Sequence, residues 1–84
     1  MSNDQEKLVI SRRNEILGAW AAELLGKRDE SADQFVRHVK AIHGLRNKDA
    51  DMINMLVKEL TGLASIHEIE AMLEAARMQA LVEL

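Results

Sequence analysis

The amino-acid sequence predicts an all-α fold, a small antiparallel bundle of four helices. Its 84 residues contain no proline and only four glycines, the two residues that most often interrupt a helix. Apolar residues recur at helical spacing in four segments, and short connections separate these segments. Gly26, Gly44 and Gly62 lie where segments end, and glycine just past a helix end takes a left-handed conformation at no steric cost. We expect one helical domain over residues 1–84.

The first helix is predicted over residues 3–25. Its apolar side chains form i, i+4 pairs along one stripe: Ile16, Leu17, Trp20, Ala21, Leu24 and Leu25. Upstream, Leu8, Val9 and Ile10 are consecutive and cover too wide an arc for one buried face. One interpretation is that one or two of them pack while the third is exposed. The other is that residues 1–11 form an arm that projects from the bundle and presents apolar side chains to a partner.

The second helix is predicted over residues 32–43, because Ser31 and Gln34 have the spacing of a capping box at its start. Its buried face is predicted to contain Phe35, Val36, Val39 and Ile42. Residues 31–48 are basic, with a single acid, Asp33, and four bases: Arg37, Lys40, Arg46 and Lys48. Either these bases pair with acids of neighbouring helices, or they form a patch for a phosphate-bearing ligand such as a nucleotide, or for an acidic protein surface.

The third and fourth helices are predicted over residues 50–61 and 66–82. Asn47 or Asp49 is expected to cap the third helix, and Ser65 with Glu68 forms a second capping box before the fourth. The buried face of the third helix is predicted to contain Met52, Ile53, Leu56, Val57 and Leu60. The buried face of the fourth is predicted to contain Ile66, Ile69, Met72, Leu73, Ala76 and Ala80.

Several classes of function are disfavoured by the composition. The chain has no cysteine, which removes thiolate metal sites and thiol nucleophiles. His38 and His43 lie five residues apart, on different faces of a helix, so no metal site and no cofactor are predicted. Carboxylate pairs occur only near predicted helix starts, with no neighbouring base or nucleophile, and we therefore expect no enzymatic activity.

The charge and hydropathy of the chain bear on its location and partners. A formal charge of −3 argues against a nucleic-acid partner. No apolar run approaches the roughly 20 residues that span a bilayer, so membrane insertion is not expected. The first six residues are polar, unlike a secretory signal, and a cytoplasmic location is predicted.

Arg12 and Arg13 are two adjacent cations that interrupt the apolar stripe of the first helix. They are interpreted either as partner-binding residues or as members of surface salt bridges. Gly18 lies within the same helix, where it costs up to about 1 kcal/mol relative to alanine. A glycine at such a position usually permits the close approach of another backbone, here most simply a neighbouring helix.

The run from Arg12 to Gly26 resembles the signature of a known family, the alphaproteobacterial ATPase inhibitor zeta subunits. The matching residues are Arg-Arg-Asn at 12–14, Gly18, Trp-Ala-Ala-Glu at 20–23 and Leu-Gly at 25–26. The resemblance implies a four-helix bundle that binds the catalytic head of the F1F0-ATP synthase. It also implies that an N-terminal helical arm enters a catalytic interface and blocks ATP hydrolysis by obstructing rotation, while the bundle acts as an anchor.

The segment before this motif departs from the family pattern, in which the arm is longer and highly charged. Here residues 1–11 precede Arg12 and would reach roughly 16 Å as a helix. One interpretation is a regulator with a short arm, whose partner-binding residues are Lys7, Leu8, Val9, Ile10, Arg12 and Arg13. The alternative is a non-inhibitory paralogue that kept the bundle and acts as a protein-interaction module or a weak nucleotide binder. The sequence leaves the oligomeric state open.

Overall fold

The computed structural model of the chain describes residues 2–46 and 49–84, with side chains for residues 4–42 and 49–84. Four α-helices make up this described part: α1 (Ser2–Leu24), α2 (Asp29–Arg46), α3 (Asp49–Glu59) and α4 (Ile66–Glu83). The prediction of an all-α four-helix bundle is confirmed, and the predicted helix ends differ from these bounds by at most three residues. Within the described ranges, no helix combines the length and the apolar character needed to cross a bilayer.

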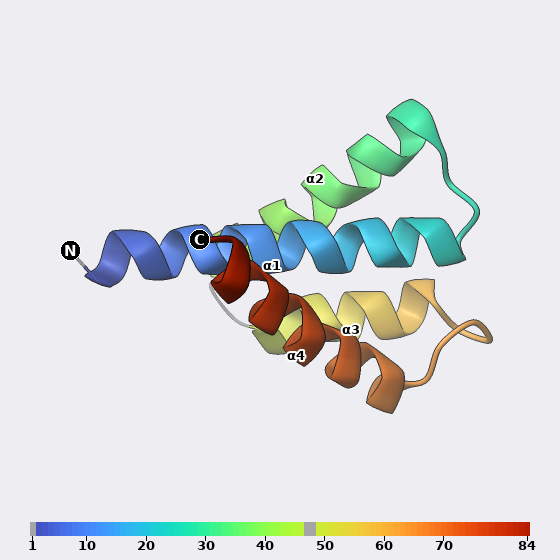
Figure 1. The fold of residues 1–84 in the computed structure, drawn as a ribbon. Helices are drawn as coiled ribbons and strands as arrows, with labels where there is room; N and C mark the ends of the chain where they lie inside the picture. Colours follow the sequence, from blue (N-terminus) through green and yellow to red (C-terminus); the bar gives the residue numbers. More distant parts are fainter. Residues whose placement is uncertain (1, 47–48) are drawn as a thin grey trace.

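Successive helices run in opposite directions, and α1 lies in the centre of the arrangement (Figure 1). This helix packs mainly against α2 and α4, while α3 packs against α2 and α4 on the remaining side. Its 23 residues give a length of about 34 Å, which covers most of the 40 Å long axis of the molecule. The C-terminal end of α4 crosses α1 near its N-terminal half (Figure 1).

Two helix ends follow the capping patterns of the sequence. Gly26 has a φ of 73°, and the amide of Lys27 donates to the carbonyl of Ala22 at 2.9 Å, which is the bonding pattern of a glycine-terminated helix. At the start of α4, the amide of Glu68 donates to the Ser65 hydroxyl at 3.1 Å. The Glu68 carboxylate accepts from the Ser65 amide, also at 3.1 Å, so the capping box is confirmed.

Two other capping predictions are wrong. Gly44 does not end a helix, because α2 continues through it to Arg46. Ser31 does not cap α2, which already begins at Asp29, and the Ser31 hydroxyl donates instead to the carbonyl of Arg28. The amides of Ser31 and Ala32 donate to the carbonyl of Arg28, the residue before α2, so the helix starts upstream of the capping signal. The predicted cap at Asn47 lies outside the described residues.

All four helices contribute to one cluster of buried side chains. Its members are Leu17, Ala21, Ala22, Phe35, Val39, Met52, Leu56, Leu60 and Ile69. Most of the predicted apolar stripes are buried or half-buried, with two clear exceptions, Leu24 and Ile66. These two residues lie in terminal turns, at the end of α1 and the start of α4, where fewer neighbours cover a side chain.

Gly18 lies where α1 and α2 approach each other closely. A Cβ atom at this position would be 3.2 Å from the Cα of Val36 and 3.5 Å from the Cβ of Val39. Both contacts are with α2, and the first is with its backbone. The prediction that Gly18 permits the approach of a neighbouring helix is therefore confirmed.

Candidate functional site

The first three turns of α1 carry the predicted partner-binding residues. The helix is unbroken from Ser2 to Leu24, and its first turns extend beyond the other helices (Figure 1). The apolar triplet divides between packing and exposure, because Val9 is buried, Ile10 is half-buried and Leu8 is 59% exposed. Lys7 is also exposed. The segment thus offers an exposed apolar and an exposed basic side chain to a partner, and contact with a partner remains a prediction.

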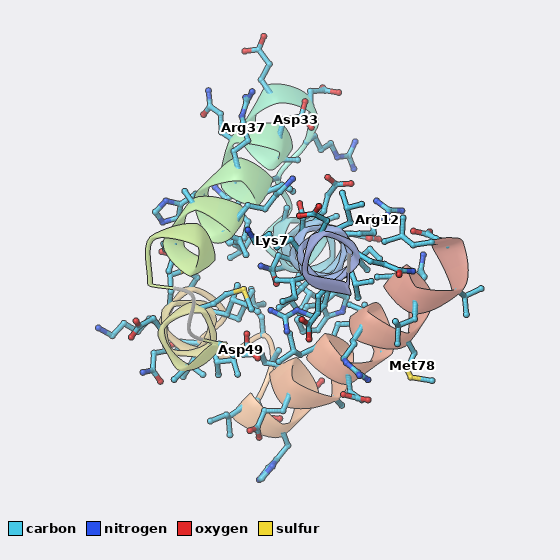
Figure 2. The ribbon with its side chains drawn as sticks, turned by 90° about the vertical axis from the view of Figure 1, so that its left-hand side faces the viewer. Lys7, Arg12, Asp33, Arg37, Asp49 and Met78 are labelled. Atoms are coloured by element: carbon cyan, nitrogen blue, oxygen red, sulfur yellow. The ribbon has the colours of Figure 1, made fainter. Side chains whose placement is uncertain are left out.

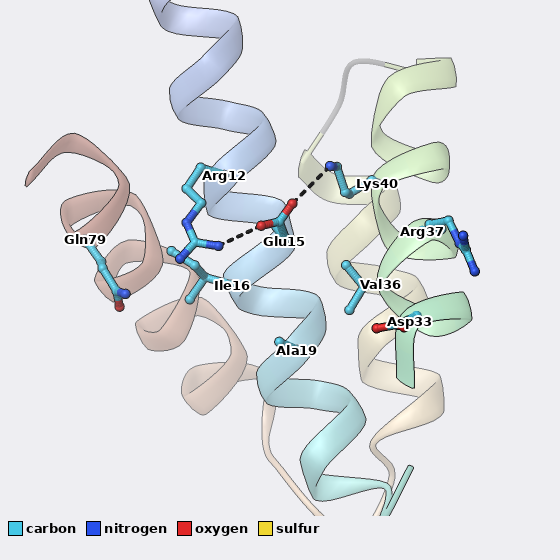
Figure 3. Close-up of a pocket in the computed structure, with 9 residues that line it drawn as sticks. All are labelled: Arg12, Glu15, Ile16, Ala19, Asp33, Val36, Arg37, Lys40 and Gln79. Carbon is cyan, nitrogen blue, oxygen red and sulfur yellow. Dashed lines mark hydrogen bonds and ion pairs between the residues drawn. The ribbon is translucent and has the colours of Figure 1, made fainter. Parts of the chain in front are cut away.

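Arg12 is at the centre of an ion-pair network that joins three helices. Its guanidinium donates to both carboxylate oxygens of Glu83 in α4, at 2.6 and 3.1 Å. It also donates to Glu15, one turn further along α1, at 2.6 Å. Lys40 of α2 donates to the other oxygen of Glu15 at 3.3 Å (Figure 3). The network therefore attaches the last turn of α4 to α1 and the middle of α1 to α2.

These contacts shift the ionisation of the groups involved. The two hydrogen bonds from Arg12, with help from Gln79, lower the pKa of the Glu83 carboxyl from 4.5 to about 2. The pKa of Glu15 is lowered by its bonds to Arg12 and Lys40. The pKa of Arg12 is raised, mainly by Glu83 and then by Glu15. Arg12, Glu15 and Glu83 therefore stay charged at neutral pH, and the partial exposure of each ion pair limits what it adds to stability.

Arg13 occupies a different environment although it is next in the chain. Its side chain is buried, with the residue only 6% exposed, and it donates to the side-chain oxygen of Asn14 at 2.8 and 2.9 Å. It also donates to the carboxylate of Asp49, the first residue of α3, at 2.8 and 3.3 Å. Asn14 is itself buried. Arg13 thus connects α1 to the start of α3 through an ion pair in which the arginine is buried and the carboxylate is about half exposed.

Asn14 is a residue whose role sequence reasoning missed. A buried asparagine needs partners for its polar atoms, and the adjacent Arg13 supplies them for the side-chain oxygen. The sequence offers one indication of this role, because Asn14 follows two arginines and precedes the apolar stripe of α1.

An open groove of about 630 Å³ lies between α1 and α2, with Gln79 of α4 at its border (Figure 3). Two of the predicted anion-binding residues, Arg37 and Lys40, line it. Lys40 is paired with Glu15, whereas Arg37 is exposed and points away from α1 (Figure 3). The groove also contains an acid of α2, Asp33. It is therefore of mixed charge, with one exposed guanidinium at its edge.

The other two predicted anion-binding residues lie outside what the structure describes in side-chain detail. Arg46 is in the last turn of α2, with a side chain that is not described, and Lys48 is outside the described residues altogether. Their placement relative to Arg37 and Lys40 therefore stays a prediction. In the described part of the chain, no three histidine or carboxylate side chains come together as metal ligands. His38 and His67 are both exposed to solvent.

Comparison with known families agrees with the motif of α1. Neither the curated proteins nor the solved structures gave a match. A family model described as ATPase inhibitor subunit zeta matches residues 2–83, a range that runs from the first residue of α1 to the last residue of α4. It includes the Arg-Arg-Asn and Trp-Ala-Ala-Glu motifs, and the family is one of inhibitor subunits and not of catalysts. The chain belongs to the ATPase inhibitor zeta subunit family.

Proposed function

We propose that this protein binds the catalytic head of the F1F0-ATP synthase and restrains ATP hydrolysis through the N-terminal part of α1. The observation that carries the proposal is the family match over nearly the whole chain. Action on the F1 head also entails a cytoplasmic location, which is part of the same proposal.

The contact segment in this proposal is residues 7–13, and its members have different roles. Lys7 and Leu8 are exposed and contact the partner directly. Val9 and Arg13 are buried, and they hold the segment in a fixed orientation on the bundle. Ile10 and Arg12 are half-exposed and form the border between the two groups. A helix held in this way loses little conformational entropy on binding, which favours affinity.

The experiment is a titration of ATP hydrolysis by purified F1 from the host of this protein. We expect the full chain to inhibit hydrolysis, and Leu8→Asp to weaken inhibition without loss of fold, because Leu8 is 59% exposed. Leu63→Asp is the matched control, since Leu63 is also about half exposed but lies in the connection between α3 and α4. Equal inhibition by both variants would contradict the contact segment.

A second arm of this experiment distinguishes an inhibitor from a non-inhibitory paralogue. A zeta subunit with a long arm is added to F1, and the present chain is then titrated as a competitor. Relief of inhibition would mean that the bundle docks on F1 but lacks an inhibitory arm. The absence of any effect in both arms would contradict binding to F1.

The position of Arg37 favours a second function, the weak binding of an anion or nucleotide. It is an exposed guanidinium at the edge of the groove between α1 and α2. Titration of the full chain with phosphate and with ADP, followed by amide chemical shifts, tests this proposal. Saturable shifts around Arg37 and Lys40 are expected, with loss in Arg37→Gln. No shifts at millimolar ligand would contradict it.

A further inference from the structure

One stripe on the side of α4 that faces away from the bundle is apolar although it is open to solvent. The buried side of α4 contains Ile69, Ala76 and Ala80. On the opposite side, four residues at helical spacing form an apolar stripe, here named the α4 outer face: Ala71, Ala75, Met78 and Val82. All four are exposed, with Met78 at 54% and Val82 at 87%. Met78 points away from the other helices (Figure 2).

Other helices of the bundle do not share this property. A helix at a protein surface ordinarily presents polar residues to water. The exposed side of α2 follows the rule with Glu30, Asp33, Gln34, Arg37 and His38. The exposed side of α3 follows it with Asn54, Lys58 and Glu59. Among the described residues, an apolar outer face of this length therefore distinguishes α4.

The apolar surface continues from α4 towards α1. Leu81 is 46% exposed and borders the α4 outer face. It also lines a groove of about 560 Å³ together with Val9 and Ile10 of α1. A contiguous exposed apolar surface of this kind marks an interaction site more often than an isolated exposed side chain does.

The charges beside the α4 outer face identify the occupant that it fits. Three carboxylates border the face, from Glu68, Glu70 and Glu74, with one guanidinium, Arg77, and the exposed imidazole of His67, which lies 4.0 Å from Glu70. Arg77 lies 3.6 Å from Glu74 and offsets the charge of that one carboxylate. The border therefore keeps an excess of acidic groups. An anionic lipid surface would be repelled by these carboxylates. A second copy of the chain would bring one acidic border against another, at a cost.

We propose that the α4 outer face binds an amphipathic helix of a partner protein, one whose apolar stripe is bordered by lysine or arginine. Ala71 and Ala75 are small and let a helix approach closely, while Met78 adapts its shape to the side chains that it meets. The carboxylates of Glu70 and Glu74 pair with the basic border of the partner helix. The α4 outer face shares no residue with the contact segment at residues 7–13, although the groove at its border reaches Val9 and Ile10 of that segment. The proposal does not depend on the proposed function.

The experiment uses the full ¹⁵N-labelled chain and two synthetic helical peptides. Both peptides carry the same stripe of leucine and alanine, and one has lysine and the other glutamate on its borders. We expect the lysine peptide to bind saturably, with amide shifts concentrated at the α4 outer face. The glutamate peptide is expected to cause no saturable shift.

Two variants and a control test the surface itself. Met78→Glu places a charge in the centre of the face and is expected to weaken binding roughly tenfold, as for the loss of a central interface residue. The double variant Glu70→Lys, Glu74→Lys is expected to exchange the preference, so that the glutamate peptide binds and the lysine peptide does not. Leu63→Glu, outside α4, is the control and should leave binding unchanged. Circular dichroism checks the fold of each variant.

The remaining outcomes overturn the proposal. Equal binding of both peptides, shifts spread over other helices, or no binding at millimolar peptide would each contradict it. Concentration-dependent dimerisation in sedimentation, abolished by Met78→Glu, would assign the face to a second copy. Binding to phosphatidylglycerol vesicles through the same residues would assign it to a membrane surface.

Discussion

The two halves of α1 differ in how the bundle surrounds them. In residues 14–24 the buried positions are Asn14, Leu17, Gly18, Ala21 and Ala22, and this half lies between α2 and α4. In residues 4–13, only Val9 and Arg13 are buried to the same degree. One continuous helix is therefore part of the core along one half and mostly surface along the other. Because apolar burial is the main stabilising contribution to folding, we expect mutations in the two halves to affect different properties.

The largest expected effect is the truncation of a core leucine. Leu17 is fully buried, and Leu17→Ala should lower the free energy of unfolding by about 2–5 kcal/mol. Leu8→Ala makes the same chemical change in the other half of α1, where the side chain is 59% exposed, and should cost less than about 0.5 kcal/mol. Urea denaturation measures both. Similar losses in the two variants would contradict the division of α1.

The next effect concerns the approach of α1 to α2. Gly18→Leu places a side chain against the backbone of Val36, whose Cα would be 3.2 Å from the new Cβ. We expect a loss of about 1–3 kcal/mol in stability from overpacking. Ala19→Leu is the control, because Ala19 is adjacent but exposed. A stability for Gly18→Leu equal to that of the control would mean that α2 can move away at little cost.

A smaller loss is expected from the buried arginine at the boundary of the two halves. Arg13→Met removes the donors to Asn14 and Asp49, and leaves the buried Asn14 oxygen without them. We expect a destabilisation of about 1–2 kcal/mol. Lys7→Met removes an exposed cation from the same helix and should change stability by less than about 0.5 kcal/mol. The two variants, Arg13→Met and Lys7→Met, are compared by their denaturation midpoints at constant pH. Equal midpoints would contradict a structural role for Arg13.

The smallest effect concerns the attachment of α4 to α1 and depends on pH. The pKa of Glu83 is about 2 in the folded chain, below its ordinary value of 4.5. The folded state therefore binds a proton at Glu83 less readily than the unfolded state does. The contribution of the Arg12–Glu83 pair to stability is complete above about pH 5 and is lost as the pH falls towards 2. Glu83→Gln should flatten this part of the pH profile of the unfolding midpoint. Glu59→Gln, which removes an exposed carboxyl of α3, is the control.

One result would contradict the attachment of α4 to α1 through Glu83. If Glu83→Gln loses stability between pH 5 and pH 2 as steeply as the unchanged chain does, Arg12 does not hold α4 through this carboxylate. Added salt gives an independent check, because it screens a partly exposed ion pair and should reduce the difference between the two proteins at neutral pH.

Local sequence alone determined the helices and some of their ends. Gly26 ends α1, and the capping box of Ser65 and Glu68 starts α4, because both motifs act through the backbone of their own neighbours. Helical periodicity likewise placed Leu17 and Leu56 in the core. The same local reasoning failed at Gly44 and Ser31, where α2 continues past one signal and begins before the other. At both positions the chain is helical, although serine and glycine are also common at helix ends.

Tertiary structure alone decided what the charged residues of α1 do. Arg12 and Arg13 are adjacent and of the same type, yet one binds Glu83 at the surface and the other is buried beside Asn14 and pairs with the half-exposed Asp49. Sequence spacing could not separate them, because their partners lie 71 and 36 residues away along the chain. Met78 and Val82 are absent from the predicted buried face of α4, but only the arrangement of the helices shows that both stay exposed.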